Sequence, residues 1–475
     1  MNHNYLKIAS KLCTGGLALC VSPLQASEAP QKMNVLFLLA DDLRWNSIGC
    51  MGSEFIVTPN IDKLSQEGVL FSNTYVTTSI SCVSRASIFT GQYMSRHGVD
   101  RFGKNLTPEQ FSQSYPGLLR SNGYWSGIVG KYGLGRGRAS DFDFASVYEG
   151  AHWYPADGSS KIERLEGGYT RIGRDSIHIT ERNVQDALKF LKNKPSDQPF
   201  CLSVGFYAPH AEDKHPDQYR YQPQSEELYR DIDIPISEKA TEQYFKSLPY
   251  FLQSDECEGR VRWHWRFETA EKYQQMMKSY YRMVSEVDEA IGRIVAELKR
   301  TGDYENTLII FMGDNGYFHS EKQLADKWFP YDEALRVPLI ICDPRLRKEG
   351  VKINEMALNI DLAPTIISAV GIDIPESIQG CDLYQIYGER RSKRGWRDDF
   401  FYEHPTINGV SIIPSSLGVV SENHKYILWS DYGVEEYFDL RRDPTESTNE
   451  IDNKRYQKAI IETRKRFEQL KTSAK

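Results

Sequence analysis

The segment NVLFLLADD, residues 34–42, decides the fold of this chain of 475 residues. An apolar run from Val35 to Ala40 is followed at once by two aspartates. A continuous apolar run predicts a strand buried on both faces of a mostly parallel sheet that helices cover. Similar runs occur at residues 308–312, 128–129 and 201–204. The chain is therefore predicted to be α/β, with a large, mostly parallel sheet sandwiched by helices.

The rest of the chain predicts a smaller second domain. A helix is expected over residues 272–300, where apolar residues recur every three or four positions. Short strand-like pieces at 400–402, 418–420 and 425–428 precede a closing helix whose apolar stripe holds Tyr456, Ile460, Thr463, Phe467 and Leu470. Single cores stop growing near ~250–300 residues. We therefore expect an α/β domain over 33–389, a basic linker at 390–397, and a C-terminal subdomain of antiparallel strands and a helix over 398–475.

The N-terminus predicts export. Lys7 and Lys11 precede the apolar stretch 12–24, and Ala26 supplies a small residue for cleavage. The stretch is too short to span a bilayer, and no later segment is apolar for long enough. Leu19 occupies the place where a lipoprotein signal ending at Cys20 needs a small residue. We expect a signal peptide over 1–26, a periplasmic or secreted chain, and no membrane span.

Composition narrows the class of protein. Hydrophobic residues make up 40% and charged residues 26%, as in soluble proteins. The net charge of −7 argues against general nucleic-acid binding. The cysteines beyond the predicted signal peptide are scattered, without the paired spacing of a zinc site and too few for a disulfide framework.

Polar side chains follow all four predicted strands. Asp41 and Asp42 end the first, Asp314 and Asn315 follow residues 308–312, and the other two lead to Lys131 and His210. Sites in parallel sheets form beyond the carboxyl ends of the strands, so these groups should meet at one edge. Clustered carboxylates repel one another unless a cation lies among them, and oxygen ligands suit calcium or magnesium. The alternative for Asp41 or Asp42 alone is a helix N-cap.

Residues 81–91, SCVSRASIFTG, carry the most specific pattern. The pattern resembles the signature of the formylglycine-dependent sulfatases (type I sulfatases of the alkaline phosphatase superfamily). In that signature a Cys or Ser is followed by any residue, then by a residue that is usually Pro or Ala, then by Ser and Arg. In this frame Ser81 is the residue oxidised to the aldehyde and Arg85 is the signature arginine, whereas Cys82 lies one position too close to Arg85. The alternative is a serine-rich turn that opens a helix.

The resemblance extends in order along nearly all of the mature chain. The matching segments are 34–42, 58–62, 96–98, 130–135, 209–210, 314–316, 327–328, 336–338, 361–365, 438–440 and 443–444. It implies an alkaline phosphatase-like fold. It also implies a calcium ion (or Mg²⁺) held by Asp41, Asp42, Asp314 and Asn315 and touching residue 81.

The resemblance also assigns catalytic roles. Arg85 and Lys131 would fix the aldehyde hydrate, one hydroxyl of which attacks sulfur while the other expels sulfate. Lys327 would bind sulfate, and His210 would protonate the leaving oxygen, a role that suits an imidazole. Taken alone, His210 could be a packed histidine, and Lys131 or Lys327 a solvated surface charge.

Three positions depart from the family pattern. Gly133 stands where the family usually has a histidine, Val83 replaces the usual Pro or Ala, and Lys322 stands where many relatives carry a histidine. Serine at position 81 implies maturation by a radical-SAM enzyme, or else an unmodified and inactive chain.

Segments 136–175 and 211–270 match the family poorly and are rich in aromatic and basic residues. Aromatic rings stack on sugars, and Arg or His pairs with further anionic groups. Candidate substrate-binding residues in these segments are His152, Trp153, Arg262 and Trp265, although the two segments could equally be lid packing. His404, outside them, is a further candidate. Together with export, they favour a sulfated polysaccharide or its oligosaccharides as the substrate.

Two other functions remain open. Phosphodiesterases and phosphonate hydrolases share the superfamily fold, although two-zinc members use histidine ligands that this pattern lacks. A non-catalytic carbohydrate-binding protein could keep the fold with an unmodified Ser81.

Overall fold

The computed structural model describes residues 32–135, 139–148, 150–156, 176–213, 215–346, 350–388, 392, 394–409 and 411–475, and residues Lys32–Lys475 form one compact unit. The predicted signal peptide, 1–26, lies outside the described residues, as do parts of the segment 136–175 and of the predicted linker 390–397. Within the described ranges, no helix combines the length and apolar character needed to cross a membrane.

A large mixed sheet forms the centre of the molecule, with strand order β12-β2-β11-β8-β1-β7-β3-β4 and β13 added beside β2. Its strands are β1 (Asn34–Ala40), β2 (Val69–Tyr75), β3 (Trp125–Gly130), β4 (Phe144–Val147), β7 (Phe200–Phe206), β8 (Thr307–Gly313), β11 (Arg336–Cys342), β12 (Val351–Ile353) and β13 (Ala357–Leu358). Only β11 runs antiparallel to its neighbours, β2 and β8. The predicted mostly parallel sheet is confirmed.

The four strands predicted from apolar runs are adjacent and parallel, in the order β8-β1-β7-β3. Their carboxyl ends are level, because Ala40 pairs with both Phe206 and Gly313, and Gly130 pairs with Gly205. The loops that follow these strands therefore begin at one edge of the sheet.

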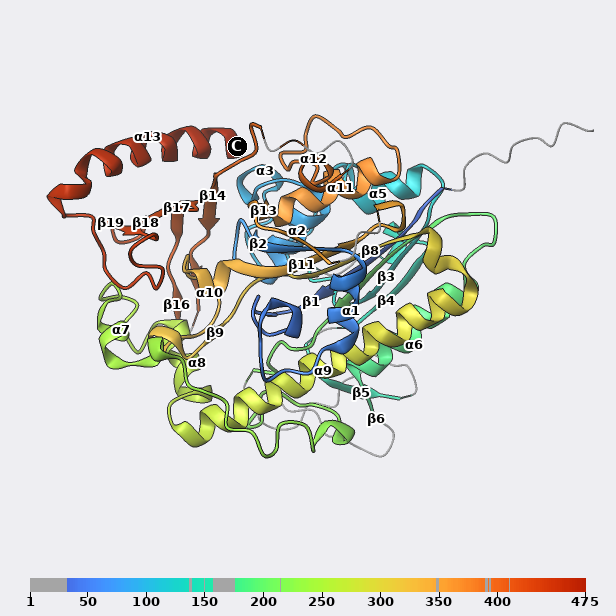
Figure 1. The fold of residues 1–475 in the computed structure, drawn as a ribbon, viewed down its shortest axis with the longest axis horizontal. Coiled ribbons are helices and arrows are strands. Elements are labelled where there is room, and N and C mark those ends of the chain that lie inside the picture. The colour runs from blue at the N-terminus through green and yellow to red at the C-terminus, as the bar shows by residue number, and fades with distance from the viewer. Residues whose placement is uncertain are drawn as a thin grey trace, which may run out of the picture. The chain divides into compact units, whose positions relative to one another are not determined.

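Helices cover both faces of this sheet (Figure 1). One face of β1 packs in a hydrophobic core with α1 (Pro59–Glu67), α6 (Ile179–Asn193) and α9 (Ala270–Thr301). The other face packs with α2 (Ser81–Thr90), α5 (Tyr115–Ser121) and α11 (Leu362–Ala369). Alternate residues of β1 enter the two cores because side chains point to opposite faces along a strand. The remaining α-helices are α3 (Met94–His97), α4 (Pro108–Ser112), α7 (Glu242–Lys246), α8 (Glu258–Arg266), α10 (Asp332–Leu335), α12 (Tyr384–Tyr387) and α13 (Gln457–Ala474).

A second, antiparallel sheet has the order β14-β17-β18-β19, and α13 covers it. Its strands are β14 (Asp399–His404), β17 (Ser416–Ser421), β18 (His424–Trp429) and β19 (Val434–Asp439). Short pairs complete the strands: β5 (Trp153–Pro155) with β6 (Ser176–His178), β9 (Phe318–His319) with β10 (Ala325–Asp326), and β15 (Ile407–Asn408) with β16 (Ile412–Ile413). The antiparallel sheet shares a hydrophobic cluster with the first part of the chain, in which Trp429 and Phe438 pack near Phe329 and Tyr331. The exact domain boundaries, 33–389 and 398–475, stay a prediction.

Candidate active site

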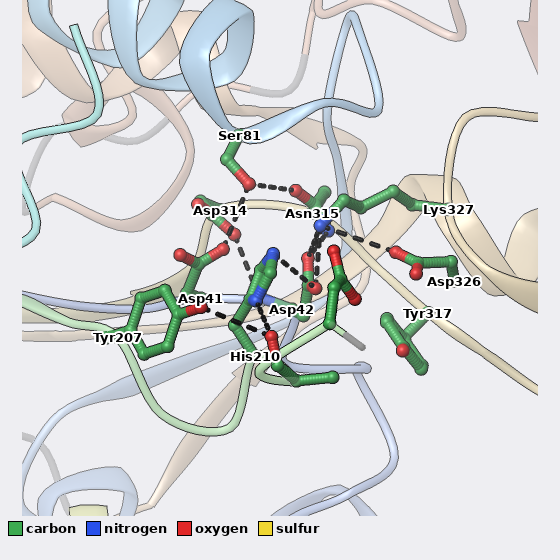
Figure 2. A network of polar contacts seen from close by, with 12 residues as sticks. Asp41, Asp42, Ser81, Tyr207, His210, Asp314, Asn315, Tyr317, Asp326 and Lys327 are labelled. Atoms are coloured by element: carbon green, nitrogen blue, oxygen red, sulfur yellow. Dashed lines mark hydrogen bonds and ion pairs between the residues drawn. The ribbon is translucent and has the colours of Figure 1, made fainter. Parts of the chain in front are cut away.

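Four polar side chains meet beyond the ends of β1 and β8. Asp41, Asp42, Asp314 and Asn315 are all almost completely buried. The backbone N–H of Asp42 donates to Asp314 Oδ1 (3.1 Å), and Asn315 Nδ2 donates to Asp42 Oδ1 (2.7 Å). Figure 2 shows these side chains grouped beneath the start of α2. The level strand ends therefore bring together the side chains that the sequence predicted to meet.

Ser81 opens α2 and points into this group (Figure 2). Its hydroxyl lies 3.0 Å from Asp41 Oδ1 and 3.3 Å from Asn315 Oδ1. Cys82 packs instead in a hydrophobic cluster with Ile80 and Val83. The structure therefore places the hydroxyl of Ser81, rather than the neighbouring thiol, against the acidic group.

Two cationic side chains flank Ser81. Arg85 lies one helical turn later and is 1% exposed; its Nε donates to Asp314 Oδ2 (2.9 Å) and its Nη1 to the carbonyl oxygen of Lys131 (2.7 Å). Lys131, just after β3, forms an ion pair with Asp41 through Nζ. Gly133 has a left-handed φ of 74°, and a Cβ there would lie 2.7 Å from Arg85 Cδ. Glycine at 133 thus leaves the room that the arginine occupies.

Lys327 approaches from the opposite side on a loop with unusual backbone angles. Its Nζ lies 2.5 and 2.6 Å from the two carboxylate oxygens of Asp42 and 3.5 Å from Asp326 Oδ1. Asp326 and Trp328, on either side of the lysine, have φ values of 74° and 81°. Such angles are costly for residues with a Cβ and occur often at functional sites. Asp326 is in turn held by Nη1 of the fully buried Arg266 (2.6 Å).

His210 lies on the loop after β7. Its Nδ1 donates to the carbonyl oxygen of Ala211 (2.6 Å), which turns Nε2 toward Asp42 Oδ2 at 3.6 Å. Burial, with the Lys327 and Lys131 ammonium groups, lowers the pKa of His210 to about 3. The imidazole is therefore neutral while no anion offsets the two lysines.

The three buried carboxylates differ in their electrostatics. Burial raises the pKa of Asp42 to about 6 against the opposing effect of Lys327, and burial together with Asp41 raises that of Asp314 to about 7. Burial would also raise the pKa of Asp41, but Lys131 and other nearby cations hold it below its usual range. For Asp42 and Asp314 the effect of burial thus outweighs the nearby cations, so further positive charge at the site would favour their ionised forms.

This donor set fits a hard divalent cation. Ligand atoms of Asp41, Asp42 and His210 lie within 4.8 Å of one another, and Asp314 and Asn315 add carboxylate and amide oxygens. Oxygen-rich sets of this kind suit calcium or magnesium. The three carboxylates balance Arg85, Lys131 and Lys327, so a divalent cation would leave the site positive and suited to an anionic substrate.

Two cavities adjoin the site. The first, which we call the Lys131 cavity, has a volume of ≈ 360 Å³, and the second, the Lys327 cavity, has ≈ 290 Å³. The Lys131 cavity is lined by Cys82, Phe102, Gly103, Lys131, Gly133, Gly135, Gly150, Tyr207, His210 and Asp213. The Lys327 cavity is lined by Phe102, His210, Asp213, Glu258, Arg262, Asp326, Lys327, Trp328, Ile407, Gly409, Ser411 and Ile413.

The predicted substrate-binding residues lie at different depths. Arg262 lines the Lys327 cavity, and its guanidinium stacks on the half-buried ring of Trp265 at 4.5 Å. His152 is fully buried, and its Nε2 donates to the carbonyl oxygen of His210 (2.8 Å), so it supports the loop that carries that histidine. Trp153 packs edge-on against His178, and His404 is buried at the end of β14. Their contact with substrate stays a prediction.

Several residues at the site were not predicted from the sequence. Asp213, Asp326 and Arg266 form a charged chain beside Lys327, and Phe102 lines both cavities. Arg266 ends α8, which is rich in Arg and Trp, so the basic segment 262–266 was the only sequence signal near them.

Comparisons with known proteins agree with this geometry. A family model described as "Sulfatase" matches residues 33–372, and one described as "N-sulphoglucosamine sulphohydrolase, C-terminal" matches residues 320–473. The chain is similar to an N-acetylglucosamine-6-O-sulfatase of Bacteroides thetaiotaomicron, at 26% identity over 96% of this chain and 89% of that protein. An arylsulfatase of Clostridium perfringens is 26% identical over 91% of this chain and 93% of its own length.

Solved structures share the fold. One, in complex with its substrate D-glucosamine-2-N,6-O-disulfate, superposes with a TM-score of 0.78 at 24% identity, covering 94% of this chain and 98% of the other. A phosphonate monoester hydrolase of Agrobacterium radiobacter gives a TM-score of 0.76 at 21% identity, covering 94% and 96%. The sulfatase model alone matches more than half of the sequence. The chain therefore belongs to the sulfatase family of sulfuric ester hydrolases.

Proposed function

We propose that this chain is an exported sulfatase that removes sulfate from a sulfated polysaccharide or its oligosaccharides, with residue 81 oxidised to formylglycine. The observation that carries the proposal is the position of Ser81, whose hydroxyl contacts Asp41 and Asn315. Lys131 pairs with Asp41, and Lys327 pairs with the neighbouring Asp42. The similarity to an N-acetylglucosamine-6-O-sulfatase supports a carbohydrate substrate. Export rests on the signal peptide predicted over residues 1–26.

Each side chain has a role that its contacts support. Lys131 and Lys327 line the two cavities and would bind sulfate oxygens there. Arg85, fixed between Asp314 and the Lys131 carbonyl, would hold residue 81 in place. An anion bound between the lysines would offset the charges that lower the pKa of His210. The ring could then carry the proton that the leaving sugar oxygen needs.

Two groups would complete the chemistry. The hydrated aldehyde would supply the hydroxyl that attacks sulfur, since an unactivated serine hydroxyl is a weak nucleophile. A calcium ion, or magnesium, held by Asp41, Asp42, Asp314 and Asn315 would supply positive charge where charge builds on the sulfuryl oxygens.

The test compares chains made with and without a radical-SAM, serine-type maturase. Mass spectrometry of the peptide that contains residue 81 should show the loss of two hydrogen atoms only with the maturase. Only that chain should hydrolyse sulfated sugars. Ser81→Ala should be inactive in both hosts, whereas Cys82→Ala, the matched control, should stay active.

Three outcomes would contradict parts of the proposal. Full activity of the unmodified chain would exclude formylglycine from the mechanism. Modified chain that binds sulfated sugars without hydrolysing any would point to a carbohydrate-binding protein. Faster turnover of a phosphonate monoester than of any sulfate ester would reassign the reaction, since one structural neighbour is such a hydrolase.

A further inference from the structure

Among the described residues that line the two cavities, three are common to both: Phe102, His210 and Asp213. These three residues border both cavities. Since His210 is the proposed acid, the sugar that carries the sulfate ester must lie against them. Phe102 and Asp213 are then the side chains placed to contact that sugar.

One of the two carboxylate oxygens of Asp213 can contact a ligand in the cavities. Its Oδ1 is shared by two arginines, an ion pair with Arg262 Nη1 and a hydrogen bond from Arg266 Nη2 at 2.8 Å. Its Oδ2 has no hydrogen-bond partner within the described part of the chain, and the side chain is 35% exposed. Burial would raise the pKa of Asp213, but Arg262 and Arg266 lower it, so the carboxylate is ionised.

An ionised carboxylate with a free oxygen selects its ligand by charge. It accepts hydrogen bonds from a hydroxyl or an amide N–H, and such charge-assisted bonds are about twice as strong as neutral ones. It repels a sulfate or a carboxylate, because neither brings a proton to the contact. The two arginines do not counter this repulsion, because Glu258 pairs with Arg262 and Asp326 pairs with Arg266 in addition to Asp213.

Phe102 supplies an apolar surface at the same place. Its side chain is exposed (60%), although it is a large hydrophobic residue. An exposed phenylalanine is unremarkable by itself. Here, however, it borders both cavities together with a carboxylate, and an aromatic ring can pack on the C–H face of a sugar.

We propose that Phe102 and Asp213 form the subsite for the sugar ring that carries the sulfate ester. The ring packs on Phe102, and a hydroxyl next to the ester donates to Asp213. The subsite therefore selects sugars with a free hydroxyl at that position and rejects those with a second sulfate there. This inference rests on the proposed function and narrows its substrate class.

The test measures binding by calorimetry in a Ser81→Ala background, so that maturation and turnover play no part. The three probes are a monosulfated sugar with a free neighbouring hydroxyl, its deoxy analogue, and the vicinally disulfated sugar. A hydrogen bond to a charged group corresponds to roughly tenfold to hundredfold in affinity, so the first probe should bind that much more tightly than the second. The disulfated sugar should bind more weakly than the monosulfated one.

Variants separate the two contacts. Asp213→Asn should abolish the preference for the hydroxyl and strengthen binding of the disulfated sugar, because Arg262 loses a carboxylate partner and keeps Glu258. The Asp213→Glu variant keeps the charge and tests the same contact if the Asp213→Asn variant does not fold. The Asp213→Glu variant should lose the preference for the hydroxyl but still reject the second sulfate. Phe102→Ala should weaken all three probes about tenfold, and Asp217→Asn, an exposed aspartate nearby, is the control that should change nothing.

The outcomes distinguish this inference from the proposed function. If neither Asp213 variant alters the order of the three affinities while the mature enzyme hydrolyses the monosulfated sugar, the subsite is wrong and the function stands. If the Ser81→Ala chain binds no sulfated sugar and the mature chain hydrolyses none, both are wrong.

Discussion

The described part of the chain contains two largely buried clusters with the same charge content and different surroundings. The catalytic cluster combines Asp41, Asp42 and Asp314 with Arg85, Lys131 and Lys327. The second, which we call the junction cluster, lies where the antiparallel sheet meets the first part of the chain and combines Lys239, Lys322 and Lys425 with Glu333, Glu436 and Glu446. Each set contains three acids and three bases.

In the junction cluster each lysine has a partner within the protein. Lys239 pairs with Glu333 (2.7 Å), Lys425 pairs with Glu446, and Lys322 Nζ donates to the carbonyl oxygen of Glu446 (2.5 Å). Glu436 accepts hydrogen bonds from Tyr331 and Trp429. Lys322, one of the three departures from the expected family pattern, therefore belongs to the packing between the antiparallel sheet and the first part of the chain.

Perturbed acids do not tell the two clusters apart. Burial raises the pKa of Glu436 to about 7, as it does that of Asp314. Access differs, because Lys131 and Lys327 line cavities, whereas none of the six junction residues lines either one. A buried charge cluster indicates a reaction site only where some of its groups can reach a ligand.

The sharpest test of this contrast exchanges one lysine from each cluster for methionine. Lys327→Met should lower turnover by about 10²–10³-fold, the effect of removing a group that stabilises charge in the transition state. Lys322→Met should leave turnover near that of the wild type. It should lower the free energy of unfolding by about 1–3 kcal/mol, because the Glu446 carbonyl loses its donor. Steady-state kinetics and urea unfolding, both with calcium present, measure the two effects; equal activity losses would abolish the distinction.

Metal removal should affect only the catalytic cluster. Calcium at a hundredfold excess over its Kd should stabilise the wild type by about 2.7 kcal/mol, because the proposed site exists only in the folded chain. Asp314→Asn should lose most of that gain, and the Lys322→Met control should keep it. Thermal unfolding with and without a chelator measures this gain in stability. An undiminished gain in the Asp314→Asn variant would exclude Asp314 from the metal site.

The smallest expected effect is the pH dependence of the junction cluster. Burial raises the pKa of Glu436 to about 7 from its ordinary value of 4.5, so between these values the folded chain holds a proton that the unfolded chain has lost. Stability should therefore fall as pH rises through this window. The Glu436→Gln variant lacks this dependence. Between pH 4.5 and 8 its free energy of unfolding should therefore rise, relative to that of the wild type, by on the order of 1–3 kcal/mol. Urea unfolding across this range is the measurement; parallel curves for the two proteins would contradict the assignment.

The central strands were predictable because a parallel strand buried on both faces has an uninterrupted apolar sequence. Their polar ends were predictable because the carboxyl ends of neighbouring parallel strands lie at one edge of the sheet. The same reading missed β11, an apolar strand inserted antiparallel between β2 and β8, because strand order depends on pairing between distant segments. The predicted helix 272–300 is confirmed as α9, and the closing helix as α13. Both helices have a regular apolar stripe that tertiary contacts did not override.

The residues around the catalytic cluster were harder to predict. Asp213 reaches the site from a loop, Asp326 from the two-residue strand β10, and Arg266 from the end of a short helix. In such short segments no periodicity marks a buried side chain. His152 is a predicted substrate-binding residue because the sequence around it is rich in aromatic residues. Composition alone, however, does not distinguish a ring that contacts substrate from one that supports a loop. In the structure the His152 ring bonds to the main chain of His210.

The tight contact between Gly133 and Arg85 bears on which residues position 133 can hold. Any residue with a Cβ would need a left-handed backbone there, and its Cβ would lie 2.7 Å from Arg85 Cδ. A histidine, which the family pattern expects at this position, can therefore enter only if the arginine side chain or the backbone after β3 moves. Since Arg85 belongs to the same pattern, the two family features are compatible only with a loop conformation other than the one in this structure.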